Sequence, residues 1–118
     1  MTTLKIWDIV KVPFPYTNRP VQQHRPALVL ACHNDPGNPA LLWVLMITSA
    51  ENRGWVSDVL VSDLSVAGLS APSVVRCVKL ATVEAVSIER IGILPEADRL
   101  LIRKYVQSLW SVMLSAPD

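Results

Sequence analysis

Two unbroken apolar runs, joined by a short polar segment, constrain the fold of this chain more than any other feature. The runs cover residues 27–32 and 40–47. Strands that are buried on both faces read as continuous apolar stretches, so both runs are predicted to be inner strands of a sheet. Between them, Asp35-Pro36-Gly37-Asn38 is typical of a β-turn with Pro36 and Gly37 as its central residues. We therefore predict a central hairpin of two buried strands.

The turn also predicts which residues lie near each other at the open end of the hairpin. If the strands fold symmetrically about the Pro36–Gly37 bond, Arg25 stands opposite Thr48. Pro26 fits the first strand position because it has no N–H, and the residue before a proline is held extended. The guanidinium of Arg25, carried on a backbone of defined conformation, and the hydroxyl of Thr48 would then lie together at one end of the sheet. Register can slip by a residue or two, so the prediction concerns neighbourhood and not contact.

The composition excludes several classes of protein. A chain of 118 residues is expected to form one domain over residues 1–118 with a real core. It is 51% hydrophobic with a formal net charge of +1, which argues against disorder and against a global basic field, so any anion site must be local. No stretch reaches the roughly 18 apolar residues of a membrane helix, and residues 1–5 lack the apolar core of a signal peptide. We predict a cytoplasmic protein that does not enter a membrane.

The chain offers little for a metal or a disulfide. Cys32 and Cys77 both sit inside apolar runs, where free cysteine behaves as a small hydrophobe, so buried packing is predicted for each. Cys32 and His33 are adjacent strand residues and would point to opposite faces, and His24 is the only other histidine. Neither a metal site nor a cofactor is expected.

The remaining elements follow from periodicity and turn residues. Apolar residues at a spacing of two predict a first strand over 4–14, a polar loop follows over 16–24, and a short loop over 50–55 lies directly beyond Thr48 and Ser49. Further strands are predicted over 56–61 and 73–83, with a helical turn over 63–70. A helix begins near Pro95, and its apolar stripe is predicted to pack on the sheet: Ile102, Tyr105, Val106, Leu109, Trp110 and Met113. The predicted fold is mainly β (α+β), a strongly curved, partly closed antiparallel sheet with a C-terminal helix.

Several blocks in this order resemble the PemK/MazF-like toxins of type II toxin–antitoxin systems. They are Asp8-Ile9-Val10, Val12-Pro13-Phe14-Pro15, Arg25-Pro26-Ala27-Leu28-Val29-Leu30, Ile47-Thr48-Ser49, Pro72-Ser73-Val74-Val75-Arg76-Cys77 and Ile91-Gly92. The resemblance spans nearly the whole chain. It implies an SH3-like barrel with appended helices, a homodimer, metal-free cleavage of single-stranded RNA, and a cognate antitoxin that holds the enzyme inactive.

The resemblance also implies roles for single residues. Arg25 matches the family arginine before proline, which stabilises the phosphate and takes part in proton transfer. Thr48 matches the hydroxyl residue that contacts the scissile phosphate, and Arg76 matches an arginine that works with a carboxylate two residues further on. Here that position is Val78, so the general base is open between His24, Glu51 and a substrate phosphate oxygen. His24 is favoured because histidine titrates near neutral pH without a large shift.

The RNA backbone is expected to lie across the surface of Arg25, Thr48 and Arg76. Other polar and aromatic residues of the two loops and of the strand over 73–83 are candidates for further contacts to RNA. Arg19, Arg53 and Lys79 are expected as auxiliary phosphate contacts, and Tyr16 and Trp55 as platforms for bases. Ser49 and Glu51 complete the predicted substrate-binding set.

Each candidate also has a purely structural interpretation. Arg25 could form an ion pair with Asp8 or Glu51, Thr48 and Ser49 could simply end a strand, and His24 could be a loop residue without a task. Arg76 could extend past core residues to water, and Tyr16 and Trp55 could cover the edge of the core.

The sequence as a whole predicts the toxin component of a type II system, a sequence-selective endoribonuclease. Its reaction would be transphosphorylation that leaves a 2′,3′-cyclic phosphate and a free 5′-hydroxyl. The alternative is a catalytically weak or inactive barrel that binds nucleic acid or an antitoxin protein.

Overall fold

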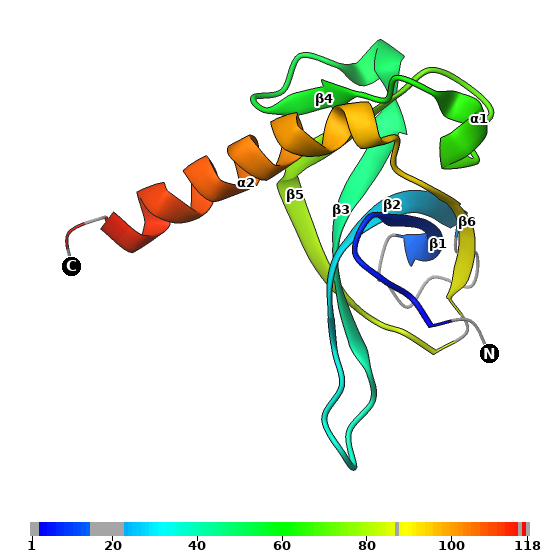
Figure 1. Ribbon diagram of the computed structural model, residues 1–118, viewed down its shortest axis with the longest axis vertical. Helices are drawn as coiled ribbons and strands as arrows, with labels where there is room; N and C mark the ends of the chain where they lie inside the picture. Colours follow the sequence, from blue (N-terminus) through cyan, green and yellow to red (C-terminus); the bar gives the residue numbers. More distant parts are fainter. Residues whose placement is uncertain (1–2, 15–22, 87, 116, 118) are drawn as a thin grey trace.

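A six-stranded antiparallel sheet, flanked by one long helix, forms the body of the molecule in a computed structural model that describes residues 3–14, 23–86, 88–115 and 117 (Figure 1). The elements are β1 (Asp8–Phe14), β2 (Gln23–His33), β3 (Leu41–Ser49), the 3-10 helix η1 (Ala50–Asn52), β4 (Asp58–Leu60), α1 (Leu64–Ala67), β5 (Ser73–Glu84), β6 (Glu89–Ile93) and α2 (Glu96–Ser115). No helix in these ranges is long and apolar enough to cross a membrane.

The predicted central hairpin is confirmed in β2 and β3. Asn38 donates its backbone N–H to the carbonyl of Asp35 at 3.1 Å, and Gly37 has a φ of 85°, which glycine adopts readily at the second central position of a turn. Ala27, Leu28 and Val29 pair with Met46, Leu45 and Val44, which is the symmetric register predicted from the turn. The register shifts only nearer the turn, between Val29 and Ala31.

The mainly β fold with a C-terminal helix is confirmed, and the sheet is curved but not closed. Its strand order is β4-β5-β3-β2-β1-β6, so β4 and β6 are the two edges, and the strand pairs formed by the described residues do not join them. β4 is only three residues long, and α1, which follows it, packs against β6. A helical turn therefore meets that edge where a barrel would place another strand.

Both faces of the central strands are buried over residues 27–29 and 44–47, as their unbroken apolar sequence predicts, whereas Trp43 and the part of β2 nearer the turn are exposed. One cluster packs under α1 and α2 and contains Leu28, Leu45, Ile47 and Ile102. The second cluster lies on the other face and contains the neighbours Ala27, Val29, Val44 and Met46. Because adjacent strand residues point to opposite faces, β2 and β3 contribute alternately to the two clusters.

Two predictions for the N-terminal edge are wrong. β1 begins at Asp8 and not near residue 4, because residues 6–7 form a turn and Trp7 has a φ of 77°. β6 was not predicted as a strand at all, since Glu89 and Arg90 give it a polar start. It pairs with β1, and Arg90 there forms an ion pair with the buried carboxylate of Asp8 at 3.0 Å.

The two cysteines differ. Cys77 is buried as predicted, and burial raises the pKa of its thiol to about 11, so the thiol stays protonated and unreactive near neutral pH. Cys32 is exposed, so the prediction that it packs in the core is wrong. It lies in β2 beyond Leu28, the last residue that pairs with β1, and its Sγ donates to the backbone carbonyl of Leu4 at 3.1 Å.

The prediction that the whole apolar stripe of α2 packs on the sheet is wrong for its last part. Ile102 is fully buried, and Val106 and Leu109 are partly buried against the first cluster. Further along, Trp110 is 36% exposed but still packs on the sheet, with 5.7 Å between its ring centroid and that of Trp43 on β3, whereas Met113 is 61% exposed. The reason is visible in Figure 1, where the C-terminal half of α2 extends past the sheet.

The contact between α1 and β6 allows two backbones to approach closely. A Cβ atom added to Gly92 would meet the backbone of Ala67 and Gly68 at less than the separation of any real Cβ contact. Gly68 lies at the end of α1 with a φ of 72°, and a Cβ there would meet the carbonyl of Ile91. Only glycine fits at both positions.

We predict that Gly92→Ala destabilises the fold strongly. The obstructing atoms belong to backbone and cannot rotate away, so the free energy of unfolding should fall by about 3 kcal/mol, as for a severe overpacking change. Gly37→Ala is the control, because its φ is positive but its added Cβ would have nothing within 4 Å. It should cost only about 1 kcal/mol. Urea denaturation followed by tryptophan fluorescence measures both; equal losses would contradict the close packing.

Candidate functional site

Arg25 and Thr48 line one open pocket at the end of the sheet that is farthest from the hairpin turn. The pocket has a volume of about 310 Å³ and lies between the ends of β2 and β3, η1 and the loop before β5. Its lining residues are Arg25, Pro26, Ile47, Thr48, Ser49, Asn52, Leu69, Ser70, Ala71, Pro72 and Ser73. The prediction that Arg25 and Thr48 are neighbours is therefore confirmed.

Arg25 is carried on the extended backbone that its proline neighbour imposes. It pairs with Val12 in the β1–β2 ladder, is exposed, and donates from Nη2 to Oε1 of Gln23 at 3.3 Å. Asp8, one of the two carboxylates considered as its partner, forms its ion pair with Arg90 instead. Arg25 thus lines the pocket from a strand that is paired with β1.

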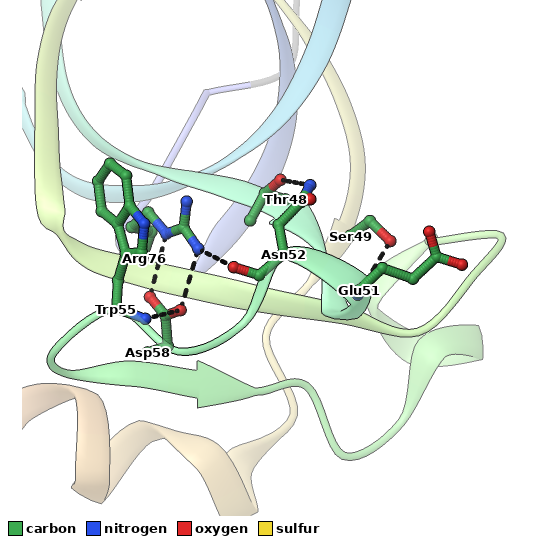
Figure 2. A network of polar contacts seen from close by, with 7 residues as sticks. All are labelled: Thr48, Ser49, Glu51, Asn52, Trp55, Asp58 and Arg76. Carbon is green, nitrogen blue, oxygen red and sulfur yellow. Dashed lines mark hydrogen bonds and ion pairs between the residues drawn. The ribbon is translucent and has the colours of Figure 1, made fainter.

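Thr48 and Ser49 end β3 and begin the next element. The Oγ of Ser49 accepts the backbone N–H of Glu51 at 3.3 Å, which caps η1. The Oγ1 of Thr48 accepts a hydrogen bond from Nδ2 of Asn52 at 3.1 Å (Figure 2). Ser49 thus has a structural role as the cap of η1, whereas Thr48 lines the pocket.

Arg76 lies behind η1, in a buried ion pair with Asp58 (Figure 2). Its Nε and Nη2 donate to the two carboxylate oxygens at 3.2 and 3.1 Å, and the side chains of Arg76 and Asp58 are only 8% and 7% exposed. Nη2 also donates to the backbone carbonyl of Asn52 at 2.6 Å. The ring of Trp55 covers the guanidinium, with 3.9 Å between the guanidinium carbon and the ring centroid.

This arrangement differs from both interpretations of Arg76 in the sequence. The guanidinium of Arg76 does not reach water. Arg76 is also not one of the described residues that line the pocket. Asp58 stands directly opposite Arg76 in the β4–β5 ladder, so the carboxylate partner comes from the neighbouring strand. The family resemblance implies a carboxylate at the position of Val78. Val78 instead lines an apolar groove beside α2.

The other predicted site residues are scattered. Glu51 is exposed on η1, and Arg53 is exposed just after it. His24 is exposed on β2, and Lys79 is half-buried on β5. None of these four belongs to the described lining of the pocket. Trp55 is 53% exposed while it stacks on Arg76. Tyr16 and Arg19 lie outside the described residues.

Two groups of site residues were missed from the sequence. Asn52 and Asp58 connect the buried arginine to the pocket, and the loop 69–73 forms one pocket wall with Ser70, Ala71 and Pro72. Asp58 left one signal, a carboxylate inside a predicted strand. The loop left none. Its backbone is joined to η1 by the bond from Ala50 N–H to the Pro72 carbonyl, and Ser73, where β5 begins, accepts from the N–H of Val61 just after β4.

The chemistry of the pocket suits an anion. It offers a guanidinium, a threonine hydroxyl and small polar side chains, and its described lining contains no carboxylate or histidine. A planar fork beside a hydroxyl matches the oxygens of a phosphate group. In the described ranges, no three His, Cys, Asp or Glu side chains come together as metal ligands.

Comparison with known proteins places this fold among bacterial toxins. Residues 5–109 match the family model described as PemK-like, MazF-like toxin of type II toxin-antitoxin system. No curated protein matches the chain in sequence. The structure of the Mycobacterium tuberculosis toxin MazF-mt6 is similar, with 26% identity and a TM-score of 0.58 over 75% of this chain and 88% of that chain.

A second solved structure is similar over more of its length. It is the MazE–MazF complex (form II) from Deinococcus radiodurans, with 22% identity and a TM-score of 0.72, covering 94% of this chain and 98% of the other. At this identity the likeness supports the fold. Because the family model matches residues 5–109, the chain belongs to the PemK-like, MazF-like toxins of type II toxin–antitoxin systems.

Proposed function

We propose that this toxin is a metal-independent, sequence-selective endoribonuclease that cleaves single-stranded RNA such as mRNA in the cytoplasm. The observation that carries the proposal is the pocket that Arg25 and Thr48 line together. Membership of the toxin family supports the choice of RNA as the substrate. The pocket is open at the end of the sheet, so an extended single strand of RNA could pass through it.

The proposed reaction is transphosphorylation. The ribose 2′-oxygen attacks the adjacent phosphorus and loses its proton, while the bond to the leaving 5′-oxygen breaks and that oxygen gains a proton. The products are a 2′,3′-cyclic phosphate and a free 5′-hydroxyl. Arg25 would bind two phosphate oxygens with its fork and stabilise the charge that builds up on them, and Thr48 would donate a hydrogen bond to one of them.

The general base is proposed to be a phosphate oxygen of the substrate. Neither a carboxylate nor a histidine belongs to the described lining of the pocket, and Arg76 with Asp58 is buried behind η1. His24 adjoins Arg25 on β2, but adjacent strand residues point to opposite faces, so it ranks second. Glu51 ranks third, because in Figure 2 its side chain extends away from Thr48.

The weak provision for proton transfer favours a second candidate function. A barrel of this family with Val78 where others have a carboxylate could bind nucleic acid or an antitoxin without cutting. Nucleic acid would then sit on Arg25 and its surroundings, with Ser49, Arg53, Lys79, Arg19 and the rings of Trp55 and Tyr16 as further contacts. The two candidates differ in one observable, the appearance of RNA fragments.

Two protein partners are also proposed. An antitoxin would inhibit by laying an acidic or aromatic disordered segment over the Arg25 pocket, where charge is complementary; the similar MazE–MazF complex supports the existence of such a partner. A second copy of the chain would cover the end of α2. Residues 105–115 of that helix carry no charge, and Val112, Met113 and Leu114 are exposed beside an apolar groove of about 330 Å³.

We predict that Arg25→Ala lowers the rate of cleavage of a long unstructured RNA, in the presence of a chelator, by about 10²–10³-fold. Thr48→Val should lower it by about tenfold, because it removes one hydrogen bond and keeps the shape. His24→Ala should stay within about tenfold of the wild type, well short of the loss expected for a general base. The control is Lys104→Ala, an exposed cation on α2. Binding without fragments would favour the second candidate, and full activity of Arg25→Ala would refute the site.

We predict that Asp58→Ala lowers the free energy of unfolding by about 3–5 kcal/mol, because it leaves the buried Arg76 charge without a partner. The double variant Asp58→Leu with Arg76→Met should recover most of that loss, since it removes both charges. Urea denaturation of both variants measures the difference. A small loss for Asp58→Ala would contradict the burial of this ion pair.

We predict that Trp110→Glu converts the protein from a dimer to a monomer at micromolar concentration. The added charge would lie on the uncharged end of α2, where a second copy is proposed to dock. Sedimentation velocity measures the mass, and Glu96→Gln at the other end of α2 is the control. A wild type that is monomeric throughout would reject the second copy as occupant of this face.

A further inference from the structure

Asn52 occupies the middle of the polar network in Figure 2. Its side-chain Nδ2 donates to Thr48 Oγ1 at 3.1 Å, and its backbone carbonyl accepts from Arg76 Nη2 at 2.6 Å. We propose that Asn52 is a positioning residue, which directs the hydroxyl proton of Thr48 into the Arg25 pocket. This inference rests on the proposed cleavage of RNA, where that proton would be donated to a phosphate oxygen.

The direction of the proton follows from the chemistry of the two groups. A hydroxyl has one proton and two acceptor positions, and an amide NH₂ group can only donate. When Asn52 Nδ2 occupies an acceptor position of Thr48, the hydroxyl proton is left for another acceptor. Thr48 lines the pocket with Arg25, so an acceptor bound there, such as a phosphate oxygen, would receive it.

The side chain of Asn52 is exposed, so its hydrogen bond alone would be weak in competition with water. Its backbone is what makes it effective. Arg76 holds the carbonyl, Asp58 and the Trp55 ring hold Arg76, and the N–H of Ala50 binds the Pro72 carbonyl at 2.9 Å. A polar side chain on a fixed backbone loses little freedom when it binds, and this is how a supporting layer sharpens a site.

The network gives the buried arginine a task that does not require contact with RNA. Arg76 and Asp58 would act on the pocket through the backbone of Asn52 and then through its amide. This role accounts for a buried ion pair next to an anion pocket. Purely apolar side chains in its place would have no donor for the backbone carbonyl of Asn52. It also separates Arg76, which supports, from Arg25, which would contact the phosphate.

The decisive variant is Asn52→Asp, which keeps the shape and reverses the hydrogen bond. At pH 8 a carboxylate can only accept, so it would take the Thr48 proton away from the pocket. Near pH 4.5 part of the carboxyl is protonated and can donate again. Relative to wild type at each pH, cleavage by Asn52→Asp should be about 10²-fold slower at pH 8 and recover severalfold near pH 4.5, with kcat changing more than KM. Asn52→Ala should be slower by roughly tenfold at every pH.

The matched control is Asn34→Asp, the same change at an exposed position after β2. It adds the same charge and should leave the rate unchanged at every pH. Circular dichroism and the melting temperature of each variant test whether the fold is retained. A ratio of Asn52→Asp to wild type that is the same at all pH values would overturn the proposal.

A second measurement tests, without any cleavage, whether Asn52 holds the side chain of Thr48 with its hydroxyl at the pocket. Three-bond NMR couplings report the χ1 rotamer of Thr48 in the protein without RNA. They should show one rotamer in the wild type and an average of several in Asn52→Ala. If the wild type cuts no RNA, the proposed function fails while the couplings still test the role of Asn52; a single Thr48 rotamer in both proteins would overturn that role.

Discussion

The structure of the pocket depends on the pairing of β3 with β2 on one side and with β5 on the other. This strand lies in the interior of the sheet, and its residues 44–47 are buried on both faces, which fixes the position of the strand next to the pocket. It stops at Ser49, whose hydroxyl caps η1, and that single change of direction places Asn52 over Thr48. The pocket is therefore a product of where a well-packed strand ends.

How much of this could be predicted depends on how local the cause is. The neighbourhood of Arg25 and Thr48 was predicted from one turn. The pairs nearest the turn are offset by one residue, and the shift between Val29 and Ala31 restores the predicted register toward Arg25. The pair of Arg76 and Asp58 did not follow, because it requires β4 to lie beside β5, and no short turn specifies that pairing. The close approach of Gly68 and Gly92 was hidden for the same reason.

The helix shows a different limit. Its apolar spacing correctly indicated an amphipathic helix and the side that faces the sheet, as burial of Ile102 confirms. The same spacing continues to Met113, which is 61% exposed at the edge of the groove beside β5. Periodicity gives the direction of an apolar face but not the size of the surface that receives it. The pocket wall at Ser70, Ala71 and Pro72 was missed because small residues in a loop have no pattern.

The β2–β3 hairpin has a practical consequence. Its tip, at Pro36 and Gly37, lies at the other end of these strands from Arg25 and Thr48 and extends beyond the rest of the sheet. Residues 33–39 there are exposed, and such tips tolerate inserted sequence well. An affinity tag or a fluorescent reporter could be built into this tip and leave the opposite end of both strands unaltered.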